Sequence, residues 1–415
     1  MSIGSWLAQR VVQPVVANAL LGWERHESGV AYHPGSAEAI ADPYPLYGEL
    51  RRKDPVHRMR LIDAWALTRY RDIDRVLRDH QTFSSAVASR VQRRTGLVSM
   101  LETDPPDHTR LRSLVSQAFT PRSIERLRPR VERIAEDLVE AAANSDRLDL
   151  MASIAYPLPV IVIAEMLGVP SQDMARFEKW SNDISLNIEP ILDDEEIVRV
   201  RSAAEELTEY FEGIIMLRRS DPKDDIISAL VAAEEEGDKL THEELIRTLI
   251  LLLVAGNETT RNLIGNGVLA LLSNPDQLEL LRENPGLMGS AVKELLRYDS
   301  PVQLDGRTAT ADVELGGRSI SAGQYVIAVI GAANRDPDVF ENPDRLDIRR
   351  SGAGHLSFGR GIHYCLGAPL AEMEGRIALG AVMRKFPKIR LAAEPVRRRQ
   401  TVLRGLKHLW IETAA

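Results

Sequence analysis

One long apolar stretch constrains the fold of this chain more than any other feature. It starts at Thr241-His242-Glu243-Glu244, a capping box in which a threonine and a glutamate three residues apart mark a helix start. It ends at Asn274-Pro275, because proline cannot continue a helix. A helix of about 32 residues would be roughly 48 Å long, and residues 249–254 are all apolar. The pattern predicts a helix that crosses the core of a large, mainly helical protein.

Polar residues follow where this helix is expected to remain buried. The run Ala255-Gly256-Asn257-Glu258-Thr259-Thr260 comes directly after the apolar segment. Glu258 and Thr259 would be costly to bury without partners. Two interpretations fit the pattern: either the apolar face has rotated away at this point, or the carboxylate and the hydroxyl form a functional pair.

The only cysteine, Cys365, lies in a glycine-rich segment, Ser357 to Gly367. Glycine permits tight turns and close approach of the backbone to a ligand. A helix is expected from about Gly367 to Lys385, and its positive end would favour the thiolate. A single cysteine excludes an intrachain disulfide and a multi-cysteine metal site. On its own, Cys365 fits either a buried inert residue or a metal ligand.

Composition excludes several classes of function. The net charge is −8 at pH 7, so nothing favours binding to nucleic acid. No run of about 20 apolar residues exists, so no membrane span is expected. One cysteine in 415 residues is typical of a protein in a reducing cytoplasm.

The first residues have a character of their own. Residues 5–21 are fairly apolar but are interrupted by Gln13 and Pro14. The Ala17-Asn18-Ala19 sequence resembles a signal-peptidase site, although the apolar run before it is weak. A short amphipathic arm, packed on the body or loosely held, is the preferred interpretation.

Periodicity predicts the remaining elements. A long irregular segment is expected over 82–101, and a loop near Pro190 separates two helices. Prolines 105 and 106 open another helix, in which His108 and Arg112 share one face. Further helices are expected from about 42 to 50 and over 70–77, 121–144, 154–167, 173–188 and 194–218, and strands in a hairpin of 56–65 and 66–68 and over 313–315, 319–320 and 324–330.

Three motifs together resemble the cytochrome P450 family. Phe358 to Gly367 fills every fixed position of its Phe-Gly-x-Gly-x-His-x-Cys-x-Gly loop, and Ala255 to Thr259 resembles its oxygen-activation motif. Glu294-Leu295-Leu296-Arg297 matches its Glu-x-x-Arg. The resemblance implies a mainly α fold with a smaller β region and haem between the long helix and the cysteine-loop helix. It covers residues 42–415 as one haem-thiolate monooxygenase domain and leaves residues 1–41 as an arm.

The resemblance implies roles for individual residues. Cys365 would be the metal ligand, the axial thiolate of a haem b iron. Gly256 would leave room for dioxygen, Thr259 would hydrogen-bond toward it, and Glu258, here in place of the commoner aspartate, would relay protons. Buried propionates need cationic partners. Cofactor contacts would come from Ala255, Phe358 and Gly359, and propionate contacts from His108, Arg112, His363 and Arg307, the last in a loop at 305–307.

Two further groups follow from family position. Glu294, Arg297 and Arg345 would form an ion network that maintains the fold around the cysteine loop. The substrate pocket is expected to be largely aliphatic, with Gln303 able to orient one polar group. Its walls would include parts of 82–101 together with Leu251, Val254, Val302, Gln303, Val402 and Leu403. Such a pocket suits a medium-to-bulky apolar molecule such as a terpenoid, a steroid or a fatty acyl chain.

The implied reaction needs external partners. A soluble bacterial member of the family uses O2 and electrons from a ferredoxin, reduced in turn by an NAD(P)H-dependent reductase. A monomer is expected, with the ferredoxin docking near Arg110, Arg112, Arg122 and Arg360. Two alternatives remain: a peroxide-using or rearranging haem-thiolate enzyme, and a non-catalytic haem sensor or carrier. Neither needs the Glu258–Thr259 pair, which argues against both.

Overall fold

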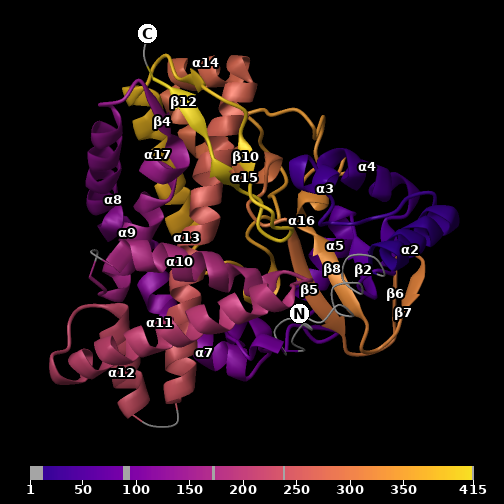
Figure 1. Ribbon diagram of the computed structural model, residues 1–415, viewed down its shortest axis with the longest axis horizontal. Coiled ribbons are helices and arrows are strands. Elements are labelled where there is room, and N and C mark those ends of the chain that lie inside the picture. The colour runs from indigo at the N-terminus through magenta and orange to yellow at the C-terminus, as the bar shows by residue number, and fades with distance from the viewer. Residues whose placement is uncertain (1–12, 87–93, 171–172, 237–238, 414–415) are drawn as a thin grey trace, which may run out of the picture.

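The computed structural model describes residues 13–86, 94–170, 173–236 and 239–413. Helices make up most of it (Figure 1). They are α2 (Gln13–Ser28), α3 (Ala37–Ala41), α4 (Tyr44–Lys53), α5 (Tyr70–Arg78), α7 (Asp107–Ser116), α8 (Pro121–Ala142), α9 (Pro157–Leu167), α10 (Met174–Ile184), α11 (Asp194–Ser220), α12 (Ile226–Glu235), α13 (His242–Ser273), α14 (Pro275–Glu283), α15 (Met288–Tyr298), α16 (Ile330–Ala333) and α17 (Ala368–Lys385).

The strands of the described residues form four sheets, the largest of which lies at one side of the molecule (Figure 1). A five-stranded sheet has the order β1-β2-β8-β5-β3, in which β2 and β8 are parallel and the other neighbours antiparallel. The strands are β1 (Val56–Met59), β2 (Ala64–Leu67), β3 (Phe83–Ser84), β4 (Arg147–Asp149), β5 (Leu304–Ala309), β6 (Val313–Leu315), β7 (Arg318–Ile320), β8 (Tyr325–Val329), β9 (Arg390–Leu391), β10 (Val396–Arg397), β11 (Leu406–His408) and β12 (Trp410–Glu412). The prediction of a mainly α fold with a smaller β region is confirmed.

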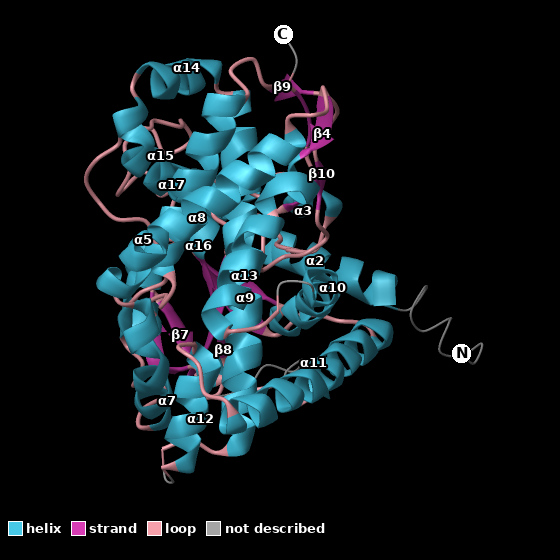
Figure 2. Cartoon of the chain, turned by 90° about the vertical axis from the view of Figure 1, so that its left-hand side faces the viewer, coloured by secondary structure: helices cyan, strands magenta, loops and turns pink. Residues whose placement is uncertain are grey.

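Helix α13 organises the large helical core, as its sequence predicts. Its capping box is present: Glu244 N donates to the Thr241 hydroxyl, and Thr241 N donates to the Glu244 carboxylate. The helix has 32 residues. It passes behind α9 in Figure 2 and packs against α9, α15 and α17. Its apolar side chains belong to the largest buried cluster, so most of the core forms around this one helix.

Three sequence-based boundaries are corrected by the structure. The hairpin turns at residues 60–63, so its second strand begins at Ala64, two residues before the expected Ala66. Residues 151–155 form a π-helical turn, so α9 itself starts at Pro157 and not at Ile154. Arg307 lies in strand β5 and not in a loop. A glycine at 306 made this strand hard to predict, because glycine is depleted in strands.

The expected ion network exists, but one of its members is different. Arg297 donates two hydrogen bonds of 2.8 Å to the Glu294 carboxylate, and both residues are buried. The third side chain is Arg350, whose Nε lies 3.1 Å from both Glu294 oxygens. Arg345 is exposed and offers the network only its backbone carbonyl. The prediction of Arg345 is therefore wrong: the chain turns after Pro343 so that only its carbonyls face Arg297.

The network predicts a sharp difference between two arginines. Arg297→Ala should lower the free energy of unfolding of the haem-loaded protein by about 3–5 kcal/mol, because it leaves the Glu294 charge buried and short of a partner. Arg345→Ala, the matched control, should change it by no more than about 0.5 kcal/mol. Chemical denaturation followed by the haem absorbance measures both. Equal losses for the two variants would contradict the assignment of Arg350.

The N-terminal arm packs on the body through one buried acid. Glu24 on α2 accepts hydrogen bonds from the backbone of Arg60 at 2.6 Å and of Tyr32 at 3.2 Å. Its carboxylate also pairs with His57 on β1 at 3.2 Å. Residues 1–12, which begin the expected arm, lie outside the described part of the chain. Within that part, no helix is both long and apolar enough to cross a membrane.

Candidate active site around Cys365

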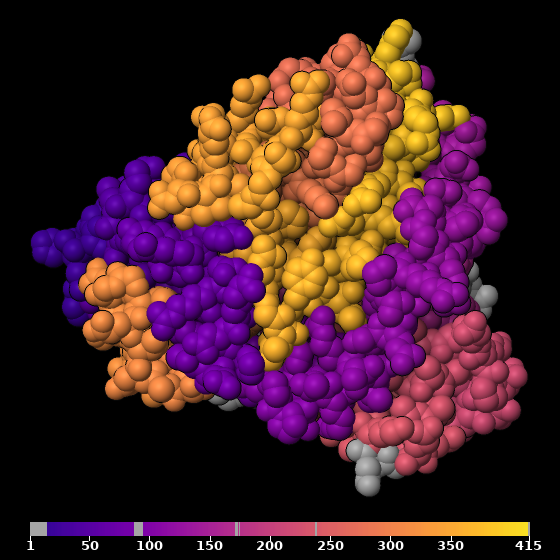
Figure 3. Space-filling view, turned by 180° about the vertical axis from the view of Figure 1, so that it is seen from behind, coloured from indigo at the N-terminus to yellow at the C-terminus, as the bar shows by residue number. Residues whose placement is uncertain are grey.

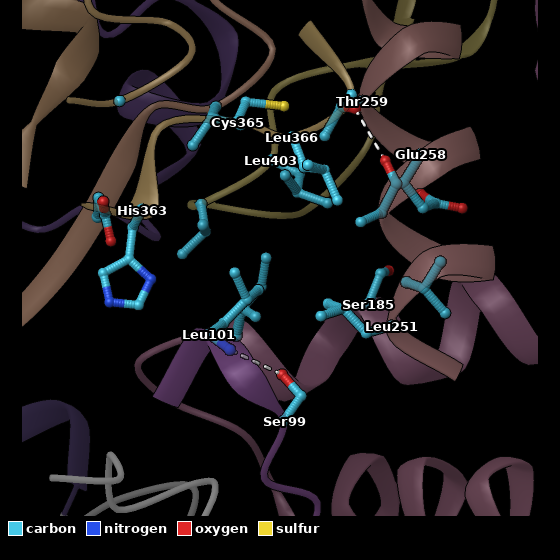
Figure 4. Close-up of a pocket in the computed structure, with 18 of the residues that line it drawn as sticks. Ser99, Leu101, Ser185, Leu251, Glu258, Thr259, His363, Cys365, Leu366 and Leu403 are labelled. Atoms are coloured by element: carbon cyan, nitrogen blue, oxygen red, sulfur yellow. Dashed lines mark hydrogen bonds between the residues drawn. The ribbon is translucent and has the colours of Figure 1, made fainter. Parts of the chain in front are cut away.

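One large cavity lies between α13 and the loop that carries Cys365. Figure 4 shows the sulfur pointing into this cavity, with Thr259 and Glu258 of α13 on the facing side. The parts of the chain that converge on it include α13, the cysteine loop, residues 97–102, the end of α10 and the turn at 402–403. Residues that are far apart in sequence are therefore brought together around the only cysteine.

The cysteine loop is shaped by glycine and by contact with α5. Gly359 and Gly361 both have φ of 68°, which other residues rarely adopt. A Cβ on Gly361 would lie 2.5 Å from the carbonyl oxygen of Leu77, so the loop can sit against α5 only with glycine there. The backbone N–H of Cys365 donates to the Phe358 carbonyl at 2.9 Å and closes the turn. This turn directs the thiol into the cavity.

The electrostatics of Cys365 differ from the expectation of a helix-stabilised thiolate. Burial is the largest influence and raises the pKa of the thiol. The backbone N–H groups of Gly367 and Ala368 and the charge of Arg112 act in the opposite direction. The free thiol is therefore not a ready thiolate, and a bound metal ion is what would deprotonate it.

Four basic side chains gather at one side of the cavity. The His108 and His363 rings lie in tilted contact with centroids 4.2 Å apart, and burial lowers the pKa of His363 to about 3. Arg307 donates to Asp305 at 2.6 Å, and Arg112 donates to the Tyr364 carbonyl at 2.6 Å. These residues come from α7, β5 and the cysteine loop.

These basic residues fit the carboxylates of a haem. His363 Nε2 is buried and has no hydrogen-bond partner within the described residues. A buried ring nitrogen that faces a cavity without a partner indicates a missing group. Neutral imidazole N–H groups beside two arginines suit two carboxylates. With a thiol aimed into the same cavity, the residues present match haem with a cysteine ligand.

The structure places the other predicted cofactor contacts at the same cavity. Phe358 and Gly359 line it from the cysteine loop, and Ala255 lines it from α13. Gly256 also lines it, but its missing side chain has a packing reason, because a Cβ would lie 2.9 Å from Ile163 of α9. This glycine lets two helices approach closely as well as keeping the cavity open.

Glu258 and Thr259 are both placed for chemistry at this cavity. Thr259 Oγ1 donates to the Ala255 carbonyl at 3.1 Å, one turn earlier on α13. Glu258 is only 1% exposed. The interpretation that the apolar face has rotated away and left Glu258 on a solvent-facing side of the helix is therefore wrong. Ser181 donates to its carboxylate at 3.1 Å, and Arg261 and Arg398 donate at 2.7 and 2.8 Å. Burial raises the pKa of Glu258, and Arg261 and Ser181 oppose the rise in part.

Sequence reasoning missed all three of these partners, Ser181, Arg261 and Arg398. Arg261 follows Glu258 by three residues, a helical spacing that could have revealed the pair. Arg398 carried no such signal, since it stands in a run of three arginines that resembles a solvated surface. It lies 140 positions from Glu258, and only the fold brings them together.

Aliphatic residues form the cavity wall opposite Cys365, as the composition predicts. Val302 and Leu403 are joined by a β-bridge and both line the cavity. Leu251, Val254 and Val402 line it too. Gln303 does not, which corrects its predicted role: its amide donates to Ser300 O at 2.7 Å and to the Tyr44 hydroxyl at 3.2 Å. These bonds hold the Gln303 side chain toward Ser300 and Tyr44, away from the cavity.

A buried carboxylate clamps the corner between α10 and α11 onto the body. Glu189 accepts hydrogen bonds from the backbone N–H groups of Thr401 and Val402 at about 3.0 Å and from the Thr401 hydroxyl at 2.5 Å. On its other side, Asn187 Nδ2 donates to the Leu97 carbonyl at 2.9 Å. The corner therefore bonds to two different walls of the cavity. No sequence motif marked either residue.

The clamp predicts faster ligand exchange when it is removed. Glu189→Ala breaks hydrogen bonds to a buried carboxylate, each contributing on the order of 1 kcal/mol, so the association and dissociation rates of a pocket ligand should both rise about tenfold. Stopped-flow absorbance of the haem measures both. Glu195→Gln, an exposed acid on the same helix pair, is the control. Unchanged exchange rates in Glu189→Ala would show that the corner does not limit access.

Comparison with known proteins agrees with this geometry. The family model for cytochrome P450 matches residues 54–398. The chain belongs to the cytochrome P450 family. It is 43% identical over 401 residues to the polyketide biosynthesis cytochrome P450 PksS of Bacillus subtilis, covering 91% of this chain and 97% of PksS. It is 42% identical to the vitamin D(3) 25-hydroxylase of Pseudonocardia autotrophica, covering 89% of this chain and 93% of that protein.

Comparison with solved structures shows that this chain has the same fold as known P450 structures. CYP109E1 from Bacillus megaterium in complex with testosterone superposes with a TM-score of 0.86 at 37% identity, covering 92% of this chain and all of that one. The P450 fold, a haem b cofactor bound through a cysteine thiolate and monooxygenase activity are therefore properties of this protein. Cys365 is the only cysteine in this P450 that can supply the thiolate.

Proposed function

We propose that this P450 uses O2 and electrons from a ferredoxin to hydroxylate, or epoxidise, a medium-to-bulky apolar molecule. The observation that carries the proposal is the pair of Glu258 and Thr259 on α13, facing Cys365 across an aliphatic cavity. We also propose that residues 42–415 act as one monomeric haem-thiolate domain in the cytoplasm, where a lone cysteine stays reduced.

Each group of residues in the cavity has its own role in the proposed reaction. Haem, when bound, supplies an iron centre that activates dioxygen. Cys365 holds the iron, and the basic group of His108, Arg112, Arg307 and His363 binds the two carboxylates. Thr259 holds a proton at Oγ1, which donates to the Ala255 carbonyl and can turn toward an acceptor in the cavity. Glu258, whose pKa is raised by burial, moves protons to this region from the side of Arg398. The aliphatic wall excludes bulk water.

The wall of the cavity supports an apolar substrate of considerable size. Leu251, Val254, Val302, Val402 and Leu403 offer apolar surface and few groups for hydrogen bonding. The relatives named above act on, or are named for, a polyketide pathway and vitamin D(3), and one structure holds testosterone. We therefore propose a substrate with a steroid-sized or polyketide-sized apolar skeleton.

The face behind Cys365 supports docking of an acidic electron donor. Figure 3 shows the segment that contains the cysteine loop and α17 at the floor of a hollow, with α7 and α8 beside it. Arg122 is exposed at the start of α8. Arg110 is less available than its sequence suggests, because Glu244 and Asp107 pair with it. A ferredoxin, reduced by an NAD(P)H-dependent reductase, has the complementary charge.

A spectral titration tests the substrate class. Purified haem-loaded protein is titrated with steroids, macrolactones, terpenoids and fatty acids, and the absorbance of the haem is followed. A steroid or macrolactone should displace iron-bound water and shift the spectrum from low to high spin with micromolar affinity, whereas small terpenoids should not. A shift with fatty acids alone would overturn the proposed class but leave the haem-thiolate chemistry intact.

A further inference from the structure

We propose that the exposed apolar face of α2, the described part of the N-terminal arm, binds the surface of a lipid bilayer. This inference goes beyond the proposed function and does not depend on it. Figures 1 and 2 show α2 at the edge of the molecule. The arm would hold the enzyme on the cytoplasmic face of a membrane without crossing it.

The first observation is an exposed apolar face on α2. Residues 15, 16, 19 and 23 fall on one side of the helix, since helical neighbours lie three and four positions apart. Val15 is 64% exposed, Val16 51% and Trp23 55%. Arg60 lies over the Trp23 ring at 3.8 Å. Tryptophan beside a cationic side chain is typical of the lipid headgroup region, and exposed apolar patches mark binding surfaces.

The second observation is the sequence that precedes and includes this face. Residues 1–23 contain no aspartate or glutamate and a single charged side chain, Arg10. At the chain's own average of 60 acids in 415 residues, about three would be expected in such a stretch. Two of the five tryptophans, Trp6 and Trp23, also lie here. Twelve residues precede the described part of the chain, and they continue the apolar, acid-free character with Ile3, Leu7, Val11 and Val12.

The third observation is that the apolar face is held outward. Glu24, which is 2% exposed, is bound to Tyr32, Arg60 and His57 from the opposite side of α2. The chain after α2 is held as well, because Lys53 Nζ donates to the Gly29 carbonyl at 3.0 Å. The helix therefore cannot roll its apolar face onto the body without breaking a buried carboxylate network. A lipid surface is the occupant that suits an apolar strip with no concave shape, whose one neighbouring exposed acid, Glu27, is paired with Arg60.

The arm lies close to one wall of the catalytic cavity, so membrane binding would affect access of substrate. Val30 and Tyr32, directly after α2, pack in one buried cluster with Ile188. Ile188 also lines the catalytic cavity and adjoins the Glu189 clamp. Ile191, in the same corner, is 52% exposed. An arm bound to lipid would place this corner near the membrane, where apolar substrates concentrate.

Vesicle binding tests the inference on the full-length, haem-loaded protein. We expect it to co-sediment with vesicles of equal parts phosphatidylcholine and phosphatidylglycerol and its tryptophan emission to shift to the blue. The double variant Val15→Asp/Val16→Asp should bind at least tenfold less. The matched control is Val198→Asp, because Val198 on α11 is also 64% exposed and apolar. It should bind like the wild type.

The alternatives give different results. Wild type that stays in the supernatant, or a double variant that binds as well as wild type, overturns the inference. A dimer in light scattering that the double variant dissociates, without vesicle binding, assigns the face to a second copy and also overturns it. The inference is also overturned if an intact-mass measurement finds residues 1–19 removed, because Val15 and Val16 would then be missing from the protein. Unchanged haem spectra in all variants show that the variants fold. None of these measurements requires turnover, so a failure of the membrane-binding inference is distinct from a failure of the proposed function.

Discussion

Replacing Cys365 by serine is expected to abolish monooxygenase turnover and the thiolate-type absorbance of the carbon monoxide complex. The residue is the only thiol in the chain, and its side chain points into the cavity, so no other residue can supply a thiolate. A hydroxyl is a much weaker donor to iron than a thiolate. Activity should fall below detection, and haem content should fall with it.

The control for this variant lies on the same loop. Tyr364→Phe alters the neighbouring residue, which is 40% exposed, and should leave the thiolate spectrum intact. The carbon monoxide difference spectrum and the iron-to-protein ratio are the two measurements. A Cys365→Ser protein that keeps a thiolate-type spectrum would remove the basis of the site assignment.

The second large effect is expected at Glu258 and Thr259. Glu258→Gln keeps the size of the side chain but cannot carry a proton as a carboxyl does, so product formation should fall by about 10²-fold, in the range of general acid catalysis. Thr259→Ala should behave differently. Electron consumption should continue while most electrons appear as hydrogen peroxide, because the hydroxyl that directs protons into the cavity is gone.

The measurement compares NADH consumed, peroxide formed and product formed in one reaction. Substrate affinity, read from the spin-state shift, should change little, which separates a proton role from a packing role. Thr260→Ala is the matched control, since Thr260 is buried on the same helix and lines the same cavity but has no proton role in this proposal. If Thr259→Ala stays fully coupled, the peroxide-using, rearranging or sensor alternatives become the better explanation.

Buried polar partners set the size of these effects. Glu258 is bound on one oxygen by Ser181 and on the other by Arg261 and Arg398. Burial of a charge without such partners would shift its equilibrium entirely to the neutral form. The partners keep the carboxyl able to exchange a proton, and Arg398, which is 15% exposed, gives the group its link toward solvent.

Local sequence determined most of the helical framework and the reactive groups. The capping box and the proline after Asn274 set the limits of α13, because caps act over three or four residues. The glycines around Cys365 predicted a tight turn, since the conformations at 359 and 361 require them. A motif of contiguous residues carries its geometry with it, and for this reason Cys365, Glu258 and Thr259 could be assigned from the chain alone.

Tertiary structure alone decided which distant side chains meet. Arg350 replaces Arg345 beside Glu294, Arg398 joins Glu258, and Glu189 clamps the turn at Thr401. These pairs depend on how loops return to the core, and nothing local encodes that path. Gln303 shows the same limit on a smaller scale, because hydrogen bonds to Ser300 and Tyr44 hold its side chain away from the cavity. Spacing identifies candidates for chemistry, whereas packing over long separations selects their partners.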